Sequence, residues 1–286
     1  MQTKTAQSEY IDTSEQACLR LRTVTSAPGS FWVNSAIIYG QKEAALIDAQ
    51  FTLNDAARVV SAIKDTGTKL VSVYVTHWHP DHYFGLGVIK AAFPEARLLA
   101  LPAVVNRIKN TWRAKVEEWK PVFGEEITAA PLFPERMQGN ELMLEGEAIK
   151  IYGKAQGDAE DSSYVWIPCL KTAVCGDIVY NGVYPWTRDT DPAQRREWIK
   201  TIERIEKLSP DVVVAGHKNP DYNNDPSCLQ FMKDYLDYYD EALVYTANPQ
   251  DFIAKLEARF PNLGMKIILE LAAEAAFSDR KTPGNI

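Results

Sequence analysis

Several features that mark specialised proteins are scarce or absent in this sequence. Only four of its 286 residues are cysteines, and their spacing matches neither a CxxC pair nor a disulfide framework. No apolar run approaches the ~20 residues of a membrane-spanning helix, and residues 1–22 lack the apolar segment of a secretion signal. We therefore expect a cytoplasmic protein with reduced thiols, although Cys169 and Cys175 flank a predicted turn that would tolerate a disulfide.

An excess of positive charge is also lacking. The chain carries 31 Lys and Arg residues against 38 Asp and Glu residues, a formal net charge of −7. This balance offers no electrostatic attraction to nucleic-acid phosphates or to an anionic membrane, so we expect neither as a partner. Because 46% of the residues are hydrophobic and 24% are charged, a disordered or fibrous protein is excluded as well.

Predicted strands and helices alternate along the chain, which is typical of a layered α/β fold. Helix starts are indicated by Thr52 and by the Asp-Pro and Asn-Pro pairs later in the chain, where a capping side chain precedes proline. The predicted strands are 31–39, 44–48, 70–75, 97–101, 147–152, 163–168, 172–176 and 212–215. The predicted helices are 53–64, about 81–92, the first part of 103–145, 191–207, 226–246, 249–260 and roughly 263–277.

Three of the four histidines lie within six residues, in the segment Thr76-His77-Trp78-His79-Pro80-Asp81-His82. The segment directly follows the apolar, β-branched strand predicted at 70–75. His77 and His79 would project to the same side of an extended backbone, while the last two residues of the segment would begin the next helix and diverge from them. Two metal ions ~3.5–4 Å apart, as in binuclear hydrolytic sites, fit such a short motif.

This His-x-His-x-Asp-His pattern resembles the signature of the metallo-β-lactamase-fold hydrolase superfamily, and further landmarks follow in order. Asp48 ends a predicted strand as the family's early aspartate does, and Asp177 and His217 resemble the ligands of its two later strand-end motifs. The resemblance implies an α/β fold of the αββα sandwich type, with two mixed sheets flanked by helices. It implies one domain over residues 1–286, with a core at about 31–220 and a helical C-terminal extension at 221–286.

The sequence departs from the family at one ligand position. Members usually carry a Gly-His-Thr-x-Gly-Ser segment before the bridging aspartate, whereas the matching stretch here is Gln156-Gly157-Asp158-Ala159-Glu160-Asp161-Ser162-Ser163. No histidine remains for this position, and Asp158 falls on it. We expect Asp158 to be a ligand, because three acids there would repel one another without a cation. The alternatives are Glu160, Asp161, or an acidic turn beside an incomplete first site.

The resemblance then implies two divalent metal ions with Asp177 between them. One ion would be held by His77, His79 and Asp158, and the other by Asp81, His82 and His217. With a bridging hydroxide such a site is neutral, because it has one carboxylate more than the usual family set. The additional carboxylate is a harder ligand than imidazole, so Mn or Fe becomes more tolerable beside Zn, which is the default expectation.

The expected activity is metal-dependent hydrolysis, in which a metal-bridged hydroxide attacks a small, partly apolar or aromatic ester, lactone, thioester or amide. Asp81 is the expected catalytic residue, because it could orient the hydroxide or pass its proton to the leaving group in addition to binding metal. Aromatic side chains crowd the ligand motifs and could line a pocket, and Lys218 could bind a substrate carboxylate. The expected substrate-binding residues are Trp78, Phe84, Tyr180, Tyr184, Trp186 and Lys218.

Other readings of the same residues stay open. They are a small-molecule phosphodiesterase, a mononuclear iron oxygenase of the same fold, and a non-catalytic ligand-binding protein with a degenerate site. Region 103–145, which contains Trp112, Trp119 and Phe123, could form a lid or side wall of the pocket. Helices at 226–277 could cover the site or form the contact of a homo-oligomer.

Overall fold

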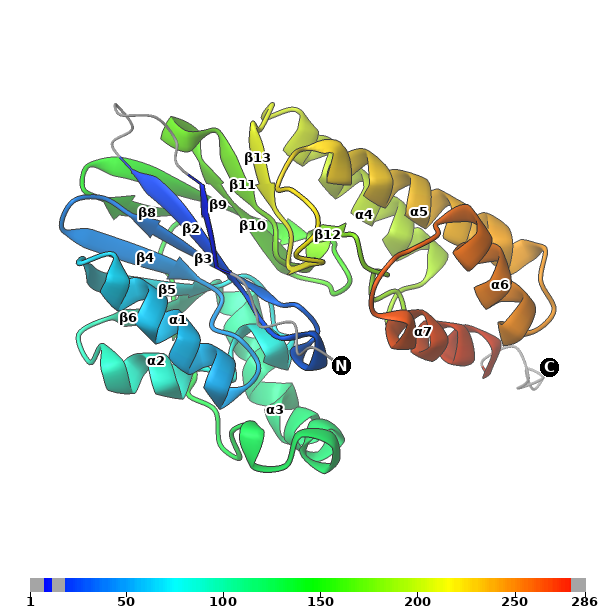
Figure 1. Cartoon of the computed structure of the whole chain (residues 1–286), viewed down its shortest axis with the longest axis horizontal. Coiled ribbons are helices and arrows are strands. Elements are labelled where there is room, and N and C mark those ends of the chain that lie inside the picture. Colours follow the sequence, from blue (N-terminus) through cyan, green and yellow to red (C-terminus); the bar gives the residue numbers. More distant parts are fainter. Residues whose placement is uncertain (1–7, 12–18, 279–286) are drawn as a thin grey trace.

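Two β-sheets stacked face to face form the centre of the computed structural model, and helices lie against their outer faces (Figure 1). The structure describes residues 8–11 and 19–278. The arrangement confirms the predicted αββα sandwich with two mixed sheets, followed by C-terminal helices.

The first sheet has seven strands that lie in the order of the sequence. Neighbouring strands are antiparallel from β1 to β4 and parallel from β4 to β7. The parallel part brings the carboxyl ends of its strands to one edge of the sheet, where loops can carry functional side chains. The strands are β1 (Ser8–Ile11), β2 (Arg20–Thr25), β3 (Asn34–Tyr39), β4 (Glu43–Ile47), β5 (Lys69–Val75), β6 (Arg97–Ala100) and β7 (Glu135–Arg136).

The second sheet has five strands in the order β13-β11-β10-β9-β8. All of its pairs are antiparallel except β11 and β13, which are parallel. Its strands are β8 (Glu141–Leu144), β9 (Glu147–Ala155), β10 (Ser162–Ile167), β11 (Thr172–Val174) and β13 (Val212–Val214). A separate parallel pair, β12 (Tyr180–Asn181) and β14 (His217–Lys218), follows the ends of β11 and β13.

Three hydrophobic cores hold the four layers together. The first lies between the two sheets, the second between the first sheet and its helices, and the third between the second sheet and the remaining helices. The helices on the first sheet are α1 (Leu53–Asp65), α2 (Leu86–Ala92) and α3 (Pro102–Phe123). The others are α4 (Pro192–Glu206), α5 (Ser227–Val244), α6 (Pro249–Arg259) and α7 (Lys266–Ser278). Single 3-10 turns lie at Pro28–Ser30, Pro80–His82, Gly124–Glu126, Pro168–Leu170 and Gly176–Ile178.

Two local predictions differ from the structure near the histidine motif. The helix expected from about residue 81 begins only at Leu86, because Pro80–His82 forms a separate 3-10 turn. The strand expected from Phe31 begins at Asn34, because Phe31 and Trp32 adopt positive φ angles of 65° and 50° after the preceding 3-10 turn. Both departures are turns set by tertiary contacts, which hydrophobic periodicity does not register.

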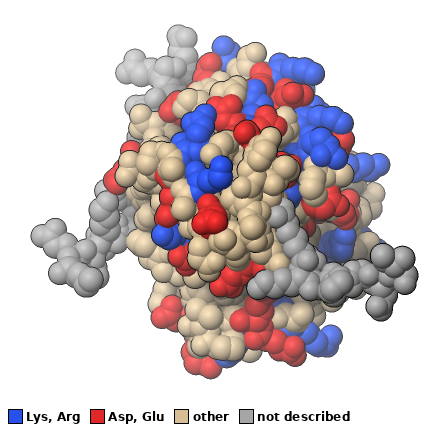
Figure 2. Space-filling model, turned by 90° about the vertical axis from the view of Figure 1, so that its right-hand side faces the viewer, with Lys and Arg blue, Asp and Glu red and all other residues tan. Residues whose placement is uncertain are grey.

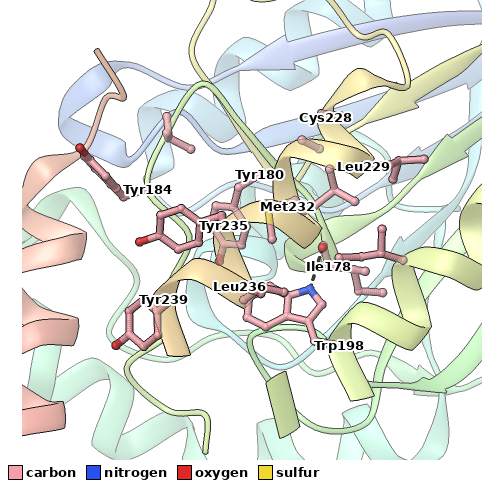
Figure 3. Close-up of a cluster of buried hydrophobic side chains, with 14 of the residues drawn as sticks. Ile178, Tyr180, Tyr184, Trp198, Cys228, Leu229, Met232, Tyr235, Leu236 and Tyr239 are labelled. Carbon is pink, nitrogen blue, oxygen red and sulfur yellow. Dashed lines mark hydrogen bonds between the residues drawn. The ribbon is translucent and has the colours of Figure 1, made fainter. Parts of the chain in front are cut away.

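The C-terminal helices pack directly on the segment that follows Asp177. The indole N–H of Trp198 on α4 donates a 2.8 Å hydrogen bond to the backbone carbonyl of Ile178 (Figure 3). Buried side chains of α5, among them Met232 and Tyr235, belong to the same core. The helical extension is therefore continuous with the part of the fold that carries the ligand motifs.

The state of the cysteines, the hydropathy of the helices and the surface charge show no specialised feature in the described residues. Cys175 and Cys228 are buried free thiols, and Cys18 lies outside the described residues. Within the described ranges, none of the helices is both long and apolar enough to cross a membrane. Basic and acidic side chains are interspersed on the face formed by the C-terminal helices (Figure 2).

Candidate metal centre

The histidine and aspartate side chains of the sequence motifs come from segments at one edge of both sheets. The histidine motif follows β5, Asp177 follows β11, and His217 follows β13. Asp158 lies in the loop between β9 and β10. Because these strands end beside one another, residues up to 140 positions apart in the sequence meet in space.

Seven side chains form two overlapping groups at this edge. In each group, one ligand-type atom from every residue lies within 4.8 Å of the others, and Asp177 belongs to both. Each group thus contains two imidazoles and two carboxylates, which suits a divalent transition metal. The groups are His77, His79, Asp158 and Asp177, and Asp81, His82, Asp177 and His217.

The donor atoms fit a pair of cations. Nε2 of His77, Nε2 of His79 and Oδ1 of Asp158 are buried and have no hydrogen-bond partner among the described residues. Nε2 of His82 and Oδ1 of Asp177 lie 3.0 Å from each other. An unpaired buried polar atom costs about 1–3 kcal/mol, so three of them in one cluster favour a bound cation, and two divalent metal ions would satisfy all three.

Neighbouring groups orient three of the imidazoles. The carboxylate of Asp48 accepts hydrogen bonds from Nδ1 of His82 at 2.8 Å and from the hydroxyl of Thr76 at 2.8 Å. The Thr76 oxygen in turn accepts from Nδ1 of His77 at 3.0 Å, and the Phe31 carbonyl accepts from Nδ1 of His217 at 2.6 Å. Since Nδ1 is the donor in each ring, Nε2 carries the lone pair that a metal needs.

The electrostatics of the cluster favour cations. Burial opposes the charged form of His217, but the carboxylates of Asp177 and Asp81 raise its pKa to about 10. Burial likewise opposes ionisation of Asp177, yet His217, His82 and His77 bring the pKa of its carboxyl well below the ordinary value. The Asp177 carboxylate therefore stays ionised while His217 retains its proton, and metal binding would displace that proton.

Asp158 is the acid of its loop that reaches the cluster. Its Oδ2 lies 2.8 Å from Nδ1 of His79, and its Oδ1 lies 3.9 Å from Nε2 of His77. Glu160 instead lies at the surface, where it pairs with Arg107 at 3.0 Å. The sequence alternatives Glu160 and Asp161 are absent from both groups of ligand-type side chains.

Tyr180 joins the two halves of the cluster. Its hydroxyl donates to Oδ2 of Asp177 at 2.9 Å and lies 3.2 Å from Oδ2 of Asp158. Its ring lies parallel to the imidazole of His217, with 5.2 Å between the ring centroids. Burial and both carboxylates raise the pKa of Tyr180 well above its ordinary value, so its hydroxyl keeps the proton that it donates.

The close packing of the Asp177 side chain against the backbone before His217 depends on a glycine at position 216. A Cβ atom at Gly216 would lie 2.0 Å from Oδ1 of Asp177 and 2.6 Å from the carbonyl carbon of Gly176. No side chain fits there, because real Cβ contacts are longer than 3.0 Å. The glycine before His217 is therefore required by packing of the ligand loops on each other.

A cavity opens above the cluster. Apart from the ligand-type residues, most of its wall is apolar, and Lys115 on α3 adds a charged side chain. The wall residues are Phe31, Phe51, Pro80, Lys115, Trp119, Tyr180, Trp186, Met265 and Ile268, together with His79, Asp81, Asp158, Asp177 and His217.

Of the six side chains expected to bind substrate, only Tyr180 and Trp186 line this cavity. Phe84 and Lys218 are fully buried, and neither is among the residues that line the cavity. Tyr184 is turned into the C-terminal core, where its hydroxyl donates to the Phe260 carbonyl at 3.3 Å. The structure therefore places these three side chains outside the cavity wall.

Trp78 is also absent from the cavity wall. Its ring is half-buried under the side chains of Arg107 and Lys115, which lie 5.9 and 5.8 Å from the ring centroid. The three residues that follow it in the motif, His79, Pro80 and Asp81, are in the wall. A position beside a ligand thus did not suffice to predict a wall residue.

Sequence reasoning missed several wall residues. Phe31 and Phe51 sit in loops without a motif, and their rings stack at 6.2 Å only in the folded protein. Met265, just before α7, and Ile268, within α7, come from the C-terminal extension, which the sequence marked only as a potential cover. The aromatic content of 103–145 was the one available signal, and of its three named residues Trp119 lines the cavity, whereas Trp112 and Phe123 do not.

Comparison with known proteins agrees with the fold. The model of the family described as the metallo-beta-lactamase superfamily matches residues 31–217, more than half of the chain. A metallo-beta-lactamase family protein from Thermus thermophilus is 20% identical with a TM-score of 0.67, and the match covers 94% of this chain and 95% of that one. DIM-1 metallo-beta-lactamase is 18% identical with a TM-score of 0.57, covering 81% and 97%. The metallo-beta-lactamase from Pontibacter korlensis is 17% identical with a TM-score of 0.57, covering 81% and 99%.

Proposed function

The chain belongs to the metallo-β-lactamase superfamily, and from this premise we propose that it is a metal-dependent hydrolase of small, partly apolar or aromatic esters, lactones, thioesters or amides. One observation carries the proposal: seven imidazole and carboxylate side chains converge at the floor of a mainly apolar cavity, with buried donor atoms left unpaired. A merely structural cluster would pair those atoms with protein groups.

The metal centre proposed is binuclear, with Zn as the default ion and Mn or Fe as alternatives. When bound, two divalent cations supply hydrolytic chemistry by acidifying a water molecule and polarising the scissile bond. His77, His79 and Asp158 would hold one ion, and Asp81, His82 and His217 the other, with Asp177 shared. Tyr180 would keep the Asp177 and Asp158 carboxylates in position through its hydroxyl.

Asp81 is the proposed proton carrier. It lines the cavity, and its side chain is 14% exposed, which is more than that of any partner in its ion pairs with His82 and His217. Burial opposes its ionisation, but His82 and His217 bring the pKa of the carboxyl below the ordinary value. An ionised Oδ atom facing the cavity can accept a proton from water and deliver it to a leaving group.

A panel of esters, lactones, thioesters, amides and phosphodiesters tests the proposal, with metal content measured by mass spectrometry on the same preparation. We expect about two metal ions per chain and turnover of a carbonyl substrate that a chelator abolishes. Asp81→Asn should abolish turnover, because it removes the proposed proton carrier and a metal-ligand carboxylate, and Asp161→Asn, which makes the same change at a residue outside the cluster, should leave turnover unchanged.

The same measurements separate the alternatives. Turnover of phosphodiesters alone would replace the carbonyl class with phosphodiester hydrolysis. One iron per chain with oxygen consumption would indicate the mononuclear oxygenase, and absence of bound metal and of turnover would indicate a ligand-binding protein.

A further inference from the structure

Two cavity side chains come from a part of the chain that lies beyond the family match. Met265 precedes α7, and Ile268 lies in its first turn, whereas the match ends at residue 217. The C-terminal extension therefore contributes to the wall above the ligand cluster in addition to packing on the fold. We call the segment from Leu263 to Ile268 the α6–α7 corner.

The α6–α7 corner is fixed to the loop that follows Asp177. The Gly264 N–H donates to the Gly182 carbonyl at 2.9 Å, and the Tyr184 N–H donates to the Gly264 carbonyl at 3.1 Å. A Cβ atom at Gly264 would lie 2.2 Å from the indole of Trp32, so the corner also packs closely on the loop before β3. These contacts hold the position of Met265 relative to the metal centre.

Helix α7 determines which of its side chains face the cavity. Leu269, Ala273 and Phe277 are buried in the C-terminal core, where the Phe277 ring lies 5.8 Å from that of Phe252. Because these three side chains fix the orientation of α7 against the core, the Ile268 side chain faces inward and is 5% exposed. The adjacent Ile267 points outward and is 51% exposed. The helix thus offers a cavity residue and a matched control at neighbouring positions.

The remaining wall residues define what the corner can bind. Phe51 and Trp119 pack edge to face, with ring centroids 5.6 Å apart, and belong to the same cavity as the corner. Outside the ligand cluster, Lys115 is the charged side chain of the wall among the described residues, and its ammonium is paired with Glu118 at 2.8 Å. An ionised group placed here would lose its hydration without gaining an unpaired partner.

We infer that the α6–α7 corner, through Met265 and Ile268, forms the subsite for an uncharged apolar acyl group of the substrate and sets the acyl length that the protein accepts. The description of the bound group as an acyl group rests on the proposed hydrolysis. Burial of apolar atoms is the driving force, so each methylene that leaves water should raise kcat/KM about fourfold until the cavity is filled.

Hydrolysis of p-nitrophenyl esters by the metal-loaded protein tests the inference, with acetyl, butyryl, hexanoyl and succinyl as acyl groups. We expect kcat/KM to rise from acetyl to hexanoyl and to be at least about tenfold lower for succinyl than for butyryl, because succinyl carries a charge. Met265→Ala and Ile268→Ala should each lower the hexanoyl-to-acetyl ratio by about tenfold. Met265→Trp should reduce hexanoyl turnover and spare acetyl, because it fills the subsite.

Ile267→Ala is the control and should leave the ratio unchanged. The ratio is independent of metal loading and of the folded fraction, so a partly unfolded variant still reports on the subsite. An unchanged ratio in both alanine variants, or an equal fall in Ile267→Ala, would overturn the inference.

Binding of 2-octanone and 2-butanone, followed by tryptophan fluorescence, separates this inference from the proposed function, since ketones have no leaving group. Tighter binding of 2-octanone that weakens in Met265→Ala, together with no ester turnover, would retain the apolar subsite and reject hydrolysis. Turnover without any chain-length dependence would retain hydrolysis and reject the subsite.

Discussion

Oδ2 of Asp48 lies 2.8 Å from Nδ1 of His82, which fixes a ligand-type imidazole from a strand end 34 positions earlier in the sequence. The same carboxylate binds the backbone N–H and the hydroxyl of Thr76. Asp48 therefore orients the motif that follows β5 without belonging to either group of ligand-type residues.

Asp48→Asn should weaken metal binding by about 10- to 100-fold, because an amide cannot accept all three hydrogen bonds and His82 loses its orientation. Calorimetric titration of the metal-free protein with Zn²⁺ measures the affinity. Asp65→Asn, at a surface residue that pairs with Arg22 at 3.5 Å, is the control. An unchanged affinity in Asp48→Asn would mean that His82 needs no support from Asp48.

Asp158→Ala should lower the metal content from about two ions per chain to about one, because the first group loses a carboxylate and keeps two imidazoles. Asp158→His should restore two ions and favour Zn over Mn, since imidazole is the softer ligand. Glu160→Ala is the control, because Glu160 pairs with Arg107 at the surface. Two ions per chain in Asp158→Ala, measured by mass spectrometry, would remove Asp158 from the centre.

Gly264→Ala should destabilise the protein by about 1–3 kcal/mol, because its Cβ would lie 2.2 Å from the Trp32 indole and one of them must move. Gly87→Ala provides the opposite case, because no atom lies within 4 Å of a Cβ at that position in α2. Alanine is also the better helix former, so this control should gain up to about 1 kcal/mol. Urea unfolding monitored by circular dichroism measures both changes, and equal stability of the two variants would contradict the packing argument.

Glu145 should contribute stability that depends on pH. Its carboxylate accepts hydrogen bonds from the backbone N–H groups of Gln41, Lys42 and Glu43 at 3.1, 2.6 and 2.7 Å, and these bonds lower its pKa from the ordinary value of 4.5. Because the folded pKa is below the unfolded one, the contribution is present above the unfolded value and is lost as the pH falls through the folded value.

Glu145→Gln should therefore cost about 1 kcal/mol at neutral pH, a figure reduced for the exposure of the site to solvent. The difference from the parent protein in urea unfolding should shrink as the pH falls below the ordinary value of 4.5. Glu141→Gln, an exposed position on the neighbouring strand, should show no such trend. A difference that stays constant down to pH 3 would exclude the ionised carboxylate as its source.

Much of the fold and of the metal centre could be predicted from the sequence, because both depend on short-range patterns. Thr52 caps α1 as expected, with its side chain accepting from the Asp55 N–H, and the apolar run before His77 is strand β5. Asp158 was identified by its place in a motif, and the structure brings it to the histidines. Residue type and spacing carry such information without knowledge of the packing.

The cavity wall could not be predicted in the same way. Lys218 follows a ligand-type histidine directly, yet its side chain is fully buried, and Phe84 lies in the core under the first sheet. Met265 reaches the cavity from a segment that shares no motif with the ligands. Which side of a loop faces the cavity depends on contacts between distant segments, such as that of Gly264 with Trp32.

The sequence by itself determined the ligand-type residues and the strand ends that bear them, because imidazole and carboxylate chemistry belongs to single side chains at fixed short spacings. Only the tertiary structure decided which apolar side chains surround them. That choice follows from how the two sheets and the C-terminal helices pack together, and packing is a property of segments more than 200 residues apart, such as those of Phe31 and Ile268.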